Sequence, residues 1–296
     1  MPHDDMEDKP LTHLADKGSA PTVTDRKAHP TLAGKNAHPT LAGRNAELAR
    51  DIVPTSILMG IVLLGWELAV RLRHVPTYIL PAPSLIAATL WRHAPTYLSA
   101  AAITLSEALG GLLIGLWVGI IVAITITFWS NLERGILALA ILLKATPMVA
   151  IAPLLIIWFG FGALPKIIIT AIITFFPVLI NVHSGLNAVD EALLALFHSL
   201  NASRWELFRY ARWPSALPYL FAALKVVAPL SLVGAVVAEW AGASVGLGRT
   251  MWLAYTNLNL PALFAAVFCS ATMGVGLYTV VIAVEKQVVF WKAKEE

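Results

Sequence analysis

Six long apolar segments constrain this chain more than any other feature of its sequence. A helix that crosses a bilayer needs about 20 consecutive, mostly apolar residues. The segments that meet or approach this length are residues 54–70, 103–128, 135–159, 164–186, 219–240 and 261–291. Only 13% of the 296 residues are charged, whereas a soluble domain carries about 25%. We therefore predict an all-α protein with about six transmembrane helices, embedded in a lipid bilayer.

Lysines and arginines near the segment ends predict the orientation of the chain, because cytoplasmic connections carry an excess of both. With the N-terminus inside, the cytoplasmic pieces hold Lys35, Arg44, Arg50, Arg134, Arg204, Arg209, Arg212, Lys225, Lys286, Lys292 and Lys294. The outer pieces hold fewer, namely Arg71, Arg73, Arg92, Lys166 and Arg249. This bias predicts two cytoplasmic termini, with residues 292–296 as the C-terminal end, and a cytoplasmic loop at residues 187–218. The cations form no stripe interleaved with aromatics, so they do not predict nucleic-acid binding.

The first 51 residues differ sharply in composition from the rest. They hold 7 of the 21 lysines and arginines and 8 of the 18 acidic residues. They begin without a basic region and contain no apolar core, unlike a secretory signal. Residues 28–34 recur as residues 37–43, but two copies are too few for a repeat fold. We predict that residues 1–51 form a disordered cytoplasmic tail and that residues 52–291 form the membrane domain.

The polar segment at residues 187–218 carries its own helix signals. Asn187 or Asp190 can cap a helix over residues 191–200, and Asn201 can end it in the left-handed conformation. Residues 203–206 read Ser-Arg-Trp-Glu, a capping box that predicts a second short helix, which we expect Pro214 and Pro218 to close. Two short helices with an exposed aromatic pair, Trp205 and Phe208, are typical of a protein-docking surface. An amphipathic loop resting on lipid headgroups is the alternative.

This segment resembles the EAA loop of permease subunits of bacterial ABC importers. Glu191 and Ala192 stand at the first two motif positions, Leu193 replaces the second alanine, and Asn201 stands where the family usually has glycine. Residues 202–209 resemble the coupling helix, and residues 216–219 end the motif. The resemblance implies a type I importer-like bundle and a coupling loop that grips a dimer of ATP-binding subunits. The residues it assigns to ATPase coupling are Glu191, Ala192, Asn201, Ser203, Arg204, Trp205, Phe208 and Pro218.

The resemblance extends over most of residues 52–291. Residues 146–155, 158–162, 164–166 and 175–178 are similar to permeases of the nitrate, sulfonate and taurine branch, and residues 238–244 to permeases for thiamine precursors or riboflavin. The family implies a small solute such as nitrate, sulfonate, bicarbonate or a pyrimidine- or riboflavin-type compound. It also implies delivery by an extracytoplasmic solute-binding protein, a second permease copy forming a homodimer, and a place in the bacterial inner membrane. ATP would be bound by the partner subunit, so we assign this chain no cofactor, catalytic residue or metal ligand.

Charged groups within the apolar segments are candidates for the translocation path, because a charge near mid-bilayer costs at least about 2.5–3.5 kcal/mol. Lys144 lies about 13 Å into the third segment and Glu67 about 20 Å into the first, so the two could pair, or Lys144 could face the solute. Glu107 and Glu239 fall near outer segment ends, where an interfacial position is expected, although Glu239 could serve an outer gate. Asn181 could line the path or, with His183, simply satisfy a helix end.

Prolines and glycines predict interruptions of the helices. Pro147, with prolines 153, 177 and 229, can kink the apolar segments. Prolines 81 and 83 precede a short outer helix that Ser84 could cap and that would run to about Tyr97. The glycines of residues 241–248 favour a re-entrant turn lying against other helices.

Two other classes of membrane protein remain as alternatives. Residues 242–246 match the G-x-S-x-G pattern of serine hydrolases around Ser244, but no histidine follows His198 to act as the base. An ion-coupled secondary transporter would not need the coupling-like loop. The chain has no G-x-x-x-x-G-K-[ST] sequence, so it is not the subunit that hydrolyses nucleotide.

Overall fold

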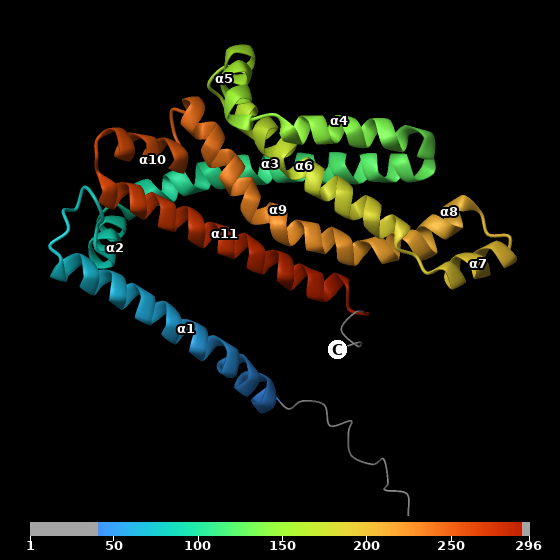
Figure 1. Ribbon diagram of the computed structural model, residues 1–296, viewed down its shortest axis with the longest axis horizontal. Helices are drawn as coiled ribbons and strands as arrows, with labels where there is room; N and C mark the ends of the chain where they lie inside the picture. The colour runs from blue at the N-terminus through green and yellow to red at the C-terminus, as the bar shows by residue number, and fades with distance from the viewer. Residues whose placement is uncertain (1–40, 292–296) are drawn as a thin grey trace, which may run out of the picture. The chain divides into compact units, whose positions relative to one another are not determined.

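The chain folds into helices throughout the part that the computed structural model describes, residues 41–291, with side chains described from residue 54 onward except residue 55. Figure 1 shows their order. The elements are α1 (Leu41–Leu72), α2 (Pro83–Arg92), α3 (Ala94–Phe128), the 3-10 turn η1 (Ser130–Leu132), α4 (Glu133–Ala145), α5 (Met148–Phe159), α6 (Leu164–Asn187), α7 (Glu191–Ser199), α8 (Arg204–Leu207), the π-helical η2 (Phe208–Arg212), α9 (Trp213–Gly242), α10 (Leu247–Thr256) and α11 (Leu260–Val288). The prediction of an all-α protein is confirmed.

The boundary predicted between the tail and the membrane domain falls within α1. Contacts divide the chain into two units, Met1–Ile57 and Leu58–Glu296, and α1 continues from the first into the second. Helix α1 begins at Leu41, within the tail predicted at residues 1–51. The remainder of that tail, with the duplicated segments, lies outside the described residues, as does the predicted C-terminal end at residues 292–296.

Four helices of the described residues are long and apolar enough to cross a membrane: α3, α6, the run from Arg204 to Gly242, and α11. A fifth span would be the pair formed by Ser130–Ala145 and Met148–Phe159, which is bent by 91°. The segment predicted as a span at residues 135–159 is therefore bent, and the predicted interruption at Pro147 is confirmed. The break falls at Thr146 and Pro147, because the residue before a proline is driven out of the helical conformation, and Thr146 has ψ 129. The predicted span at residues 54–70 lies within α1.

Helices α3, α6 and α9 form the centre of the second unit. Gly111, Gly115 and Gly119 of α3, four residues apart, face successive turns of α6, and a Cβ at any of the three would overlap a side chain of that helix. The α6 partners are Thr170, Thr174 and Val178. Small residues at this spacing let membrane helices approach closely. Because both series rise together along the chain, α3 and α6 run parallel.

Helix α9 runs in the opposite direction along α6. Gly185, near the end of α6, packs on Ala216 and Tyr219 at the start of α9, whereas Gly234, late in α9, packs on Thr170 near the start of α6. One end of this three-helix centre therefore brings together the ends of α3 and α6 and the start of α9, where the segment 187–218 is attached. The opposite end joins the end of α9 to the turn before α10.

The segment around Ser84 corrects a second prediction. Helix α2 begins at Pro83 with Ala82 as its N-cap, and it ends at Arg92 rather than near Tyr97. Ser84 caps nothing. Its backbone N–H and hydroxyl donate to the two carboxylate oxygens of Glu67, at 3.0 and 2.7 Å. The serine therefore connects α2 to α1.

Candidate functional site

The segment at residues 187–218 contains the predicted two short helices with a tight turn between them. The Asp190 carboxylate caps α7 by accepting the N–H of Ala192 at 2.7 Å. Asn201 has φ 51, and the N–H groups of Asn201 and Ala202 donate to the carbonyls of His198 and Phe197, both at 3.0 Å. This is the Schellman arrangement that usually uses glycine. The prediction that asparagine can form this turn in place of glycine is confirmed.

The capping box at the start of α8 is also confirmed. The Ser203 hydroxyl accepts the N–H of Glu206 at 3.2 Å, and the Glu206 carboxylate accepts the N–H of Ser203 at 2.7 Å. Both partners satisfy backbone donors that the first turn of a helix leaves free. This local bonding fixes the direction in which α8 leaves the turn.

The end predicted for the second helix is wrong. Pro214 and Pro218 do not close it, because α8, η2 and α9 follow one another without a sharp bend from Arg204 to Gly242. Pro214 lies in the first turn of α9, just after the π-helical turn η2. A proline ring clashes with the carbonyl four residues earlier in a regular helix, and a widened turn at this point provides room for it. The short helix of the loop is thus continuous with α9.

The aromatic pair divides into an exposed and a buried residue. Trp205 is 59% exposed, as predicted, but Phe208 is only 8% exposed, so the predicted exposed pair is wrong. The Phe208 ring packs against Phe128, Trp205 and Trp213, with centroids 5.4, 5.4 and 6.1 Å away. Phe208 therefore anchors the loop to the end of α3, while Trp205 remains exposed.

An exposed leucine stripe on α7, which was not predicted from the sequence, extends this surface. Leu193, Leu196 and Leu200 are all exposed, and their spacing of three and four residues places them on one helix face. Glu191 and Ala192, at the start of the same helix, are exposed as well. The spacing was visible in the sequence, but apolar spacing alone does not separate a docking face from a buried one.

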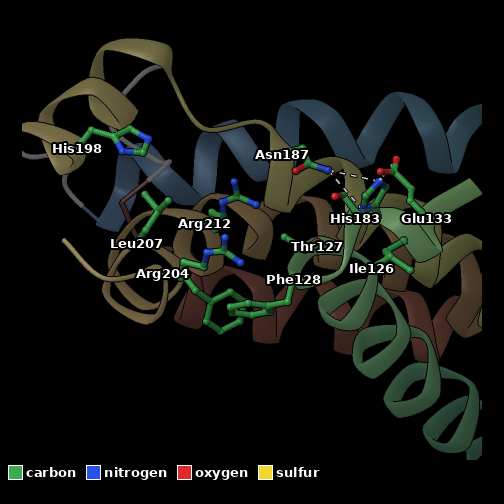
Figure 2. A pocket seen from close by; sticks show the side chains of 12 residues that line it. Ile126, Thr127, Phe128, Glu133, His183, Asn187, His198, Arg204, Leu207 and Arg212 are labelled. Atoms are coloured by element: carbon green, nitrogen blue, oxygen red, sulfur yellow. Dashed lines mark hydrogen bonds and ion pairs between the residues drawn. The ribbon is translucent and has the colours of Figure 1, made fainter. Parts of the chain in front are cut away.

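A cavity of about 430 Å³ lies between the loop and the ends of α3 and α6. Figure 2 shows Glu133, His183 and Asn187 on one side of it, and Arg204, Arg212 and His198 nearer the loop. His183 Nε2 is 3.0 Å from a Glu133 carboxylate oxygen, and Asn187 Nδ2 is 3.4 Å from the same imidazole. Of these six residues, only Arg204 was predicted for the site from the sequence.

A buried polar cluster lies at the opposite end of the three-helix centre. Lys166 Nζ donates to Glu107 Oε1 at 2.7 Å, and Thr104 Oγ1 donates to Glu239 Oε1 at 2.7 Å. Glu107, Lys166 and Glu239 are 3%, 4% and 1% exposed. Both carboxylates, predicted near the outer ends of their segments, are enclosed by helices.

The same cluster holds the start of α10. Glu239 accepts the N–H of Gly248, and Thr104 Oγ1 accepts the N–H of Leu247 at 2.8 Å. Gly246, with φ 114, is pressed so closely on the Glu239 carboxylate that a Cβ would overlap it. The glycines of residues 241–248 thus bring the start of α10 onto the end of α9. Thr104 was missed, although it lies three residues before Glu107 on the same helix face.

The predicted path residues do not form one site in the part of the chain that is described. Lys144 is exposed, and its Nζ lies 4.7 Å from the centroid of the Phe176 ring. Asn181 Nδ2 donates to the Pro177 carbonyl of its own helix at 2.8 Å, and Glu239 belongs to the buried cluster. Glu67 bonds Ser84 and forms an ion pair with Arg71, so its suggested pairing with Lys144 is wrong.

The serine-hydrolase pattern is not assembled into a catalytic site. Ser244 follows the end of α9, beside the start of α6, whereas His183 is near the end of α6. About eighteen residues of α6 lie between the start of the helix, beside Ser244, and His183, a distance on the order of 25 Å. A nucleophilic serine needs its base within hydrogen-bond reach, so His183 cannot fill that role.

The described residues form a bundle of apolar helices of the kind that crosses membranes. A capped polar loop is joined directly to one of these helices. The family described as "Binding-protein-dependent transport system inner membrane component" matches residues 111–289, and the chain belongs to this family. It is a multi-pass membrane protein and a permease subunit of an ABC importer, that is, a transport component.

Named relatives and a solved structure agree with this assignment. The chain is 34% identical to the riboflavin transport system permease protein of Chloroflexus aurantiacus, over 81% of this chain and 90% of the relative. It is 28% identical to the formylaminopyrimidine transport permease protein of Halalkalibacterium halodurans, over 82% and 96%. It is 30% identical to a putative aliphatic sulfonates transport permease protein of Escherichia coli, over 75% and 85%. The fold is similar to that in the crystal structure of an amino acid ABC transporter, with a TM-score of 0.57, 17% identity and coverage of 68% and 98%.

Proposed function

We propose that residues 190–212 dock onto a cytoplasmic ATP-binding subunit, and that two copies of this chain form the path of the importer. The observation that carries the docking proposal is the division of the aromatic pair. Trp205 is exposed, while Phe208 beside it is buried against Phe128. A surface of this kind offers a rigid aromatic anchor, the residue type that contributes most at protein interfaces.

The continuity of α8 with α9 supports the same proposal. Displacing a docked Trp205 would move the start of α9, because no flexible connection separates them. In this proposal, ATP binding closes the two ATP-binding subunits, each pulls its docked segment, and the helices rock between inward- and outward-open arrangements. Both termini would lie in the cytoplasm, and an extracytoplasmic binding protein would deliver the solute at the outer face.

For the solute we propose a small ring compound of the pyrimidine or riboflavin type. Relatives with these named substrates align over more than four fifths of the chain.

Affinity capture tests the docking proposal. Tagged permease, co-expressed with the ATP-binding subunit of its transporter, should retain that subunit in detergent, and the Trp205→Ala variant should lose most of it. The matched control is Trp91→Ala, which removes a still more exposed tryptophan from α2, next to the start of α3 and away from the loop. Equal retention by both variants would refute the assignment of Trp205.

Uptake into cells tests the solute separately. Cells carrying the complete transporter should accumulate labelled riboflavin or formylaminopyrimidine, with uptake lost when the permease is deleted. Uptake of taurine or nitrate in place of these ring compounds would overturn the solute proposal and leave the docking proposal standing.

A further inference from the structure

The cavity beneath the loop has a distinctive position. Its walls come from the end of α3 and the start of α4, from the end of α6, and from α7, α8 and η2. A molecule bound there would therefore touch the membrane helices and the docking loop at the same time. At about 430 Å³, the cavity is within the range that holds small ligands.

The charges that line the cavity are unequal. Arg204 and Arg212 contribute two guanidinium groups from the loop, and Glu133 is the only carboxylate among the lining residues. Glu133 is already bonded to His183, and both residues lie on the wall of the cavity away from the loop (Figure 2). Within the described residues, neither arginine forms an ion pair, and the nearby Glu206 carboxylate is bonded to Ser203 within its own capping box. Two charged donors thus line the cavity without an acidic partner.

Two unpaired guanidinium groups match the oxygens of a phosphate, because each presents a planar fork of N–H donors. We propose that this cavity binds a phosphate group, with Arg204 and Arg212 as its ligands. The rings of Phe128 and Phe208, which also line the cavity, give the remainder of such a ligand an apolar surface. The phosphate could belong to an anionic lipid headgroup, since basic pockets between membrane helices bind headgroups, or to a free phosphate compound.

Occupancy would join the loop to the helix ends more firmly than the Phe128–Phe208 contact does alone. This consequence for coupling depends on the docking role proposed above, but binding itself does not. The test therefore uses the full-length permease without the ATP-binding subunit, so that its failure and the failure of the docking proposal can be distinguished.

Thermal unfolding of the permease in nanodiscs, followed by tryptophan fluorescence, measures binding. One arm adds inorganic phosphate to phosphatidylcholine discs, against chloride at equal ionic strength. The other compares phosphatidylcholine discs with discs that contain phosphatidic acid. We expect the wild type to gain about 4 °C when phosphate is near ten times its dissociation constant, and the Arg204→Gln/Arg212→Gln variant to gain none.

Arg209→Gln is the matched control, because Arg209 is an exposed arginine of the same turn that does not line the cavity; it should respond like the wild type. A response confined to phosphatidic acid identifies a lipid headgroup, and one to inorganic phosphate identifies a free compound. If the double glutamine variant does not elute as the wild type does, Arg204→Lys/Arg212→Lys replaces it and should lose most of the gain. No gain in either arm, or an equal gain in the arginine variants, overturns the proposal.

Discussion

The ring of Phe208 lies 5.4 Å from the ring of Phe128, and this contact joins the loop at residues 187–218 to the end of α3. Removing it should loosen the loop without unfolding the membrane helices. Truncating a buried phenylalanine to alanine costs about 3–5 kcal/mol, but this one lies at the edge of the protein, so we expect a value nearer the lower limit. Hydrogen exchange should therefore rise in residues 191–212 of Phe208→Ala and stay unchanged in α6. Increased exchange throughout α6 would show that Phe208 supports the whole bundle.

Asn201 should tolerate glycine and reject a β-branched residue. Its φ of 51 is a conformation that glycine adopts freely, whereas for other residues the left-handed conformation costs roughly 1–2 kcal/mol. Asn201→Gly should keep full capture of the ATP-binding subunit, and Asn201→Val should weaken it. Equal capture by both would mean that the Asn201 turn does not position the docking surface.

The close packing of α3 on α6 predicts a strong effect of one added methyl group. In Gly111→Ala the new Cβ would overlap Thr170, and overpacking costs about 1–3 kcal/mol. Gly276→Ala provides the control, because nothing lies within 4 Å of that position in α11, and alanine favours a helix by about 1 kcal/mol. Thermal unfolding in detergent should thus fall for the first variant and stay level or rise for the second.

The ion pair between Lys166 and Glu107 should show strong coupling in a double-mutant cycle. Lys166→Met leaves a buried carboxylate without its partner, which costs about 3–5 kcal/mol. Replacing both groups, as Lys166→Met with Glu107→Gln, removes the unpaired charge and should restore most of the lost thermal stability. Additive losses in the cycle would mean that the two side chains act independently.

We expect the hydroxyl of Thr104 to stabilise the start of α10. Thr104→Val removes both the donor to Glu239 and the acceptor for the N–H of Leu247, and an unpaired buried donor costs about 1–3 kcal/mol. Thr104→Ser retains both bonds and is the control. Amide exchange at the start of α10 should quicken only in the valine variant; similar exchange in both would assign the effect to packing.

Local chemistry made much of this protein predictable. The caps at Asp190 and Ser203 and the turn at Asn201 depend on neighbouring residues only, so the sequence was sufficient to place them. The apolar runs predicted the membrane helices because hydrophobicity and length are also properties of one continuous stretch of sequence. The end of the second loop helix was mispredicted, because Pro214 was read as a stop, whereas a π-helical turn accommodates it.

Interactions between distant segments could not be predicted. The bonds from Thr104 to Glu239 and from Lys166 to Glu107 join different helices, and nothing in the sequence specifies that these helices meet there. The burial of Phe208 likewise depends on the end of α3. The position of a residue along its helix could be counted from the sequence. The helix that each face of it packs against could not be predicted in this way.

The uninterrupted helix from Arg204 to Gly242 has one more consequence. It carries Trp205 on its first turn and Glu239 on its last, so the indole exposed at one end and the carboxylate that holds α10 at the other share one backbone. A rotation applied at the first turn would be carried along one helix, past the interior prolines 218 and 229, to that carboxylate.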